Sequence, residues 1–149
     1  MAMNDDKLID WSAVVRGALV GLCVLVAASV VEAILDHNLA DFQDSGWIYP
    51  LFVAVLVGYG AGGWKAGRLC PDAGLSNGAL AGLGAFLLWI PVRILIWALR
   101  DDDKGLFTGH SPALRPGQLF GQIVIATGIG MLGGFVGART ATRAGREPS

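Results

Sequence analysis

The chain has 149 residues, of which 54% are hydrophobic and 15% are charged, and its formal net charge is −1. A soluble domain carries about 25% charged residues, so this composition argues against a soluble globular protein. The near-neutral charge, without a dense basic face, also argues against a nucleic-acid partner. The charged residues are clustered, and long apolar runs lie between the clusters. We therefore predict an all-α, polytopic membrane protein that forms a single membrane domain.

The apolar runs are predicted to be four transmembrane helices. A helix rises 1.5 Å per residue, so about 20 apolar residues cross the ~30 Å hydrocarbon core. Membrane-barrel strands are half as long and alternate in polarity, a pattern that these runs lack. The predicted spans are residues 14–35, 47–64, 79–99 and 119–138, with a polar leader at 1–10 and a basic tail at 139–149.

The basic residues predict the orientation of these spans. The leader holds three aspartates and one lysine, whereas a signal peptide has a basic start, so we predict an uncleaved first span. Lys and Arg favour the cytoplasmic side of a membrane protein. Seven lie on the side of the termini, and three lie on the other side. We therefore predict that both termini are cytoplasmic, and that Cys23 in the first span and Cys70 in the next cytoplasmic loop are reduced and unpaired.

Glycine is the second strong signal, with 22 residues in the chain. Helices in lipid gain little from burying apolar surface against each other, so small residues that allow close backbone contact favour their association. Four-residue glycine spacing occurs in or beside every predicted span and predicts a compact bundle. The pairs are Gly17 and Gly21, Gly58 and Gly62, Gly78 and Gly82, and Gly130 and Gly134.

Two segments also suggest an internal repeat. Residues 16–22 match residues 77–83 at five of seven positions, and residues 62–68 resemble residues 133–139 more loosely. The first two spans would then be repeated as the last two, giving two similar hairpins related by an axis along the membrane normal. The alternative is that Gly, Ala and Leu are simply common in membrane helices, and the sequence leaves both open.

Ionisable residues inside a span are costly in lipid and suggest a functional site. Glu32 and Arg93 lie at comparable depth below the outer surface, so an ion pair between the first and third spans is feasible. This arrangement suggests an outward-facing polar cavity for an ion, a lipid headgroup or a small anion. A purely structural pair, or an arginine that reaches the interface along its aliphatic stem, is the favoured alternative. Further candidate members of the cluster are Gln118, Gln122 and Thr127, with His37 at its mouth.

The rest of the sequence predicts no metal site, no cofactor and no catalytic motif. The tail contains three arginines, Arg139, Arg143 and Arg146, whose spacing suits anionic lipid headgroups. Ordinary anchoring of a cytoplasmic end explains them equally well.

Residues 16–22 and the Gly-Gly-Trp-Lys-Ala-Gly-Arg segment at 62–68 resemble small, glycine-rich, four-span bacterial membrane proteins of unknown function. The resemblance covers the first three spans best. It implies a location in the bacterial inner membrane and transfers no activity and no site residue.

Three functions are compatible with this sequence. The first is a non-enzymatic accessory or interaction subunit, which packs through glycine-rich helix faces against a copy of itself or a larger membrane partner. The second is a small oligomeric channel or transporter, with Glu32, Arg93 and Gln122 lining an outer vestibule. The third is an enzyme acting on lipid, which requires residues that the sequence does not offer. We rank them in this order, with the lipid bilayer as the common partner.

Overall fold

The computed structural model describes residues 9–39, 42–99 and 116–144. These residues are helical, apart from short connections, and contain no strand. The four long helices are α1, Trp11–Asn38; α2, Ile48–Leu69; α3, Gly74–Leu99; and α4, Pro116–Ala144. Two short 3-10 turns, η1 at Phe42–Asp44 and η2 at Pro71–Ala73, precede α2 and α3. The all-α prediction is confirmed.

Three of these helices are long and apolar enough to cross a membrane. They are α1, α3 together with η2, and α4 from Gly117 onward. The composition of α2 is different, because four glycines, Lys65 and Arg68 occupy its C-terminal half and lower its hydropathy. The architecture is therefore that of a multi-span, helical membrane protein.

The helices extend beyond the predicted spans at several ends. The predicted loop between residues 65 and 78 is mostly helical, and only Cys70 and the turn η2 separate α2 from α3. Glycine and lysine end an apolar run, but a helix continues through them when it packs against neighbours. The predicted tail begins as helix for the same reason, because α4 continues to Ala144. The helix α3 contains Pro91 and continues through it to Leu99.

Local chemistry fixes the helix ends around this turn. Asp10 caps α1, because its carboxylate accepts hydrogen bonds from the backbone N–H groups of Ser12 and Ala13 at 2.9 and 3.2 Å. The backbone N–H of Asp10 donates to Oδ1 of Asn77 at 2.9 Å, which ties the start of α1 to α3. Pro71 stands where α2 has ended. Both cysteines are free, as the sequence predicted.

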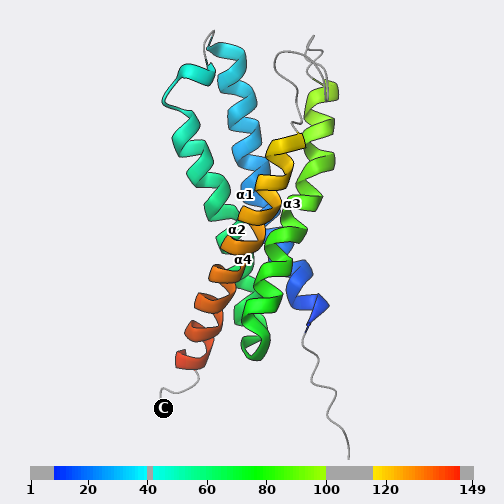
Figure 1. Cartoon of the computed structure of the whole chain (residues 1–149), viewed down its shortest axis with the longest axis vertical. Coiled ribbons are helices and arrows are strands. Elements are labelled where there is room, and N and C mark those ends of the chain that lie inside the picture. The colour runs from blue at the N-terminus through cyan, green and yellow to red at the C-terminus, as the bar shows by residue number, and fades with distance from the viewer. Residues whose placement is uncertain (1–8, 40–41, 100–115, 145–149) are drawn as a thin grey trace, which may run out of the picture.

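Two flanking helices pack against a central pair. Both α1 and α4 contact α2 and α3, and α2 and α3 also contact each other. In Figure 1, the C-terminal part of α4 lies close to α2 and α3 near the lower end, whereas the helices diverge toward the upper end. We call the lower part the glycine half, because it contains most of the buried glycines. We call the upper part the polar half, because its side chains form the polar contacts described below.

Backbone contact holds the glycine half together. A Cβ atom added at Gly17 would lie 2.5 Å from the carbonyl oxygen of Gly62, and one added at Gly78 would lie 2.5 Å from that of Gly130. Real Cβ atoms do not approach an oxygen this closely, so a side chain at either position would force the helices apart. The contacts join α1 to α2 and α3 to α4 through glycines that the sequence singled out: Gly17, Gly21, Gly58, Gly62, Gly78, Gly82, Gly130 and Gly134.

The interface between α2 and α4 is also made of glycine. A side chain at Gly63 or Gly67 would collide with the backbone of Gly130 or Gly134, respectively. Side chains at residues 133 and 137 of α4 would likewise collide with the α2 backbone. The glycine pairs that the sequence singled out are therefore occupied by contacts inside the chain.

Candidate functional site

Glu32 of α1 and Arg93 of α3 form an ion pair in the polar half. Both guanidinium nitrogens, Nη1 and Nη2, donate to the two carboxylate oxygens at 2.9 Å. The two side chains are 36% and 21% exposed, respectively. This bidentate geometry is the strong form of an Arg–carboxylate pair, and it leaves the pair with no net charge. The pairing that the sequence indicated as feasible is therefore present.

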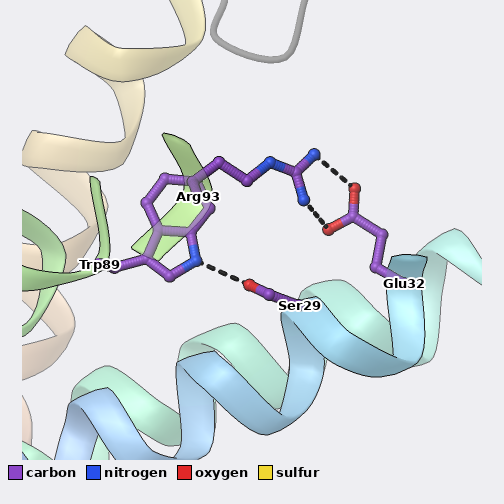
Figure 2. Close-up of polar contacts among 4 residues, drawn as sticks. All are labelled: Ser29, Glu32, Trp89 and Arg93. Carbon is purple, nitrogen blue, oxygen red and sulfur yellow. Dashed lines mark hydrogen bonds and ion pairs between the residues drawn. The ribbon is translucent and has the colours of Figure 1, made fainter. Parts of the chain in front are cut away.

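A second polar contact lies beside this pair. The indole Nε1 of Trp89 donates to the Ser29 hydroxyl at 2.7 Å. Figure 2 shows Trp89 and Arg93 reaching toward Ser29 and Glu32, so that two successive bonds join α3 to α1. The guanidinium of Arg93 also lies 5.9 Å from the centre of the Trp89 ring. The partners are 60 and 61 positions apart in the sequence. Because both bonds join α1 to α3, they fix the position of one helix along the other.

A third contact joins α2 to α4 at the boundary between the two halves. The buried Tyr59 donates its hydroxyl proton to Oε1 of Gln122 at 3.2 Å. Tyr59 also packs with Leu25, Phe86 and Ala126, which form the apolar core of the bundle. The Gln122 side chain is thereby held at the inner edge of the polar half.

Several of these side chains line a cavity of about 470 Å³, which we call the vestibule. Its volume falls within the range of about 300–1,000 Å³ that is usual for ligand pockets. The polar residues of its lining are Ser29, Glu32, Trp89, Gln118 and Gln122, and its apolar lining includes Phe42, Phe52, Val55 and Ile125.

The vestibule contains some of the predicted cluster and excludes the rest. Glu32, Gln118 and Gln122 line it, and Arg93 stands behind Glu32 as its partner. The prediction of Thr127 as a member of the cluster is wrong, because Thr127 does not line the vestibule. Its hydroxyl donates to the Ile123 carbonyl of its own helix at 2.8 Å. His37 is exposed on the last turn of α1 and does not line the vestibule.

The predicted arginine cluster lies at the opposite end of the bundle. Arg139 and Arg143 are exposed on the last turns of α4, and Arg146 lies outside the described residues. The Arg139 guanidinium lies 4.2 Å from the centre of the Phe135 ring.

Sequence reasoning missed the roles of Ser29, Trp89 and Tyr59. Their signal is a spacing rather than a charge. Ser29 precedes Glu32 by three residues and Trp89 precedes Arg93 by four, so each pair lies on one helix face. A hydrogen-bonding residue one turn from an intramembrane charge would have indicated the second contact.

No protein-family model, curated protein or solved structure matches this chain.

The lining of the vestibule is chemically mixed. The lining combines the neutralised carboxylate of α1 and two amides of α4 with aromatic and aliphatic side chains. Such a mixture orients a partly polar group through a few hydrogen bonds and excludes water around its apolar part. Within the described residues, no group of three His, Cys, Asp or Glu side chains is placed to hold a metal ion.

Proposed function

We propose that the protein is a non-enzymatic accessory subunit of the membrane, which binds a transmembrane helix of a larger partner or of a second copy beside the vestibule. Small residues and hydrogen-bonding side chains are what promote helix association in lipid. Both kinds of residue meet at one place on α4.

The observation that carries this proposal is a set of open glycines on α4. At Gly117, Gly121 and Gly128, no described atom lies within 4 Å of where a side chain would begin, whereas the other α4 glycines are packed. Their spacing of four and seven residues places them on one face of the helix. Gly121 also lines the vestibule, next to Gln118 and Gln122. A partner helix on this face would meet backbone and amide groups together.

The proposal includes a four-span topology with both termini in the cytoplasm of a bacterial cell. At 1.5 Å per residue, the 22 residues of α2 are about 33 Å long, enough to cross the hydrocarbon core. The excess of Lys and Arg at the ends of α2 and α4 supports the orientation. The vestibule would then face the outside. The matching segments 16–22 and 77–83 support two hairpins of common origin.

The test is a photo-cross-linking residue at position 121 in cells, followed by the native mass of the protein in mild detergent. We expect a cross-link to a membrane protein or a second copy, and a complex heavier than the monomer. Position 53 of α2 is the matched control, because Val53 is 55% exposed and does not line the vestibule. A lone monomer without cross-links from position 121 would refute the proposal.

A second variant separates binding from folding. Gly128→Leu fills open space, so it should dissociate the complex and leave the thermal stability of the bundle unchanged. Loss of folding in this variant would show instead that the open face packs within the chain.

The vestibule also favours an alternative, a small oligomeric channel or transporter. The glycine contacts close the opposite half of the monomer, so a path would have to run between copies. Flux through liposomes containing the purified protein, abolished by Gln122→Leu without loss of folding, would favour this alternative over the accessory role.

A further inference from the structure

A second cavity of about 470 Å³ lies at the glycine-half end of the bundle, between η2 with the start of α3 and the last turns of α4. We call it the end groove. It lies far from the vestibule and plays no part in the proposed function. Its charged lining residues are Asp72 on one wall and Arg139 and Arg143 on the other, and Ser76 of α3 and Thr142 of α4 also line it.

From this arrangement we propose that the end groove binds the headgroup of a membrane phospholipid that carries both a phosphate and a primary ammonium, as in phosphatidylethanolamine. The two guanidinium groups would bind the phosphate, and the Asp72 carboxylate would bind the ammonium.

The charges of the end groove are available for such a ligand. Among the ion pairs of described residues, none joins Asp72 to Arg139 or Arg143, although all three line one cavity. Arg139 is held in place by its contact with the Phe135 ring at 4.2 Å. The Thr142 hydroxyl donates to the Ala138 carbonyl at 2.9 Å, so its oxygen remains an acceptor. The groove therefore presents separated positive and negative groups to its occupant.

The presence of Asp72 distinguishes this proposal from general attraction to anionic lipid. Arginines alone favour any phosphate-bearing lipid, and most strongly one with a net negative charge. A carboxylate across the cavity penalises a purely anionic headgroup and favours one with an ammonium. A choline headgroup carries no N–H donor, so it cannot form the charge-assisted hydrogen bond to the carboxylate that a primary ammonium forms.

The location of the groove suits a lipid headgroup. Arg139 directly follows the apolar part of α4 and Arg143 comes about one turn later, where a helix leaves the hydrocarbon core. The apolar side chains of Leu75 and Phe135 also line the groove and offer a surface to the upper part of an acyl chain.

The experiment is native mass spectrometry of the purified full chain in mild detergent, with equal amounts of phosphatidylethanolamine, phosphatidylglycerol and phosphatidylcholine. We expect phosphatidylethanolamine to be retained preferentially. Asp72→Asn should reverse the preference toward phosphatidylglycerol by about tenfold, equivalent to about 1.4 kcal/mol. Arg139→Gln with Arg143→Gln should reduce retention of both lipids.

The matched control is Arg68→Gln. Arg68 is an exposed arginine near the end of α2, lies 4.8 Å from the Trp64 ring and does not line the groove. It should leave lipid retention unchanged. Water-soluble phosphoethanolamine, added as a competitor, should displace the lipid if the headgroup alone is recognised. If it fails to compete, the acyl chain contributes to the same site.

Three results would overturn the proposal. One is equal or stronger retention of phosphatidylglycerol by the unmodified protein. Another is an Asp72→Asn variant with unchanged lipid preference. The third is a loss of lipid in Arg68→Gln as large as in the double arginine variant, which would indicate general attraction to basic residues. None of these results bears on partner binding beside the vestibule.

Discussion

The glycine half and the polar half join the same four helices by opposite means. In the glycine half, backbone meets backbone, and a single added carbon at Gly78 or Gly130 has no room. In the polar half, the helices diverge, and long side chains such as Trp89 and Arg93 bridge the distance between them. The stability of the glycine half therefore depends on the volume of its side chains, and the stability of the polar half depends on the pairing of polar groups.

This difference follows from the solvent. Lipid solvates an apolar surface as favourably as a neighbouring helix does, so the burial of apolar surface alone gives helices little tendency to associate. Close packing and hydrogen bonds remain, and each half uses mainly one of them. The half held by side chains leaves the vestibule between the helices, whereas the end groove lies at the end of the glycine half, beyond the close glycine contacts.

The largest expected effect is that of a large side chain in the glycine half. Leucine at Gly134 would collide with the backbone of Gly74 and Gly78 in α3. Ordinary overpacking costs about 1–3 kcal/mol, and a collision with backbone exceeds this because backbone cannot change rotamer. We expect no folded, monodisperse protein by size-exclusion chromatography. The control, Gly117→Leu, lies on the same helix in open space and should fold normally.

Breaking the ion pair should have the next largest effect. Arg93→Leu leaves the Glu32 carboxylate partly buried and unpaired, which we expect to cost about 2–3 kcal/mol, since partial exposure lowers the 3–5 kcal/mol typical of buried pairs. The double variant with Glu32→Leu should recover most of this loss in thermal or denaturant unfolding. A double variant as unstable as the single one would show that the pair is not what stabilises this region.

A smaller effect is expected from the bond between Trp89 and Ser29. Trp89→Phe keeps an aromatic ring near Phe86 and removes the indole donor, so it should lower the free energy of unfolding by about 1 kcal/mol. Trp11→Phe is the control, because Trp11 is 65% exposed. Equal losses in the two variants would contradict a specific role for the bond.

The smallest effect is expected at the boundary between the halves. Tyr59→Phe removes one neutral hydrogen bond of 3.2 Å to Gln122 and should cost about 0.5–1 kcal/mol. Because this bond holds the Gln122 amide, the variant should weaken cross-linking from position 121 more than its stability loss explains. Unchanged cross-linking would exclude Gln122 from the partner contact.

The sequence predicted the helices through hydropathy and the close contacts through glycine spacing. It failed between residues 65 and 78, because glycine and lysine reduce hydropathy without ending a helix that is packed on both sides. It also treated the glycines as a surface for a partner, since spacing alone does not tell which neighbour a glycine faces.

The candidate site was predicted in part for a related reason. Glu32 and Arg93 are conspicuous because charge in lipid is rare, and Gln118 and Gln122 because they are polar. Ser29 and Trp89 are ordinary in membrane helices, and only their spacing from Glu32 and Arg93 distinguishes them in the sequence. The depth and width of the vestibule depend on how far the helices diverge, which no local pattern encodes.

The most direct test of the account is labelling of two single-cysteine variants with a membrane-impermeant thiol reagent on intact cells, after Cys23 and Cys70 are replaced by alanine. Gln118→Cys lies at the vestibule, and Thr142→Cys lies near the other end of the same helix, beside the end groove. If the vestibule faces outward, position 118 reacts from outside, and position 142 reacts only after the membrane is opened. Labelling of position 142 in intact cells, or no labelling of position 118, would contradict a vestibule that faces outward from the polar half.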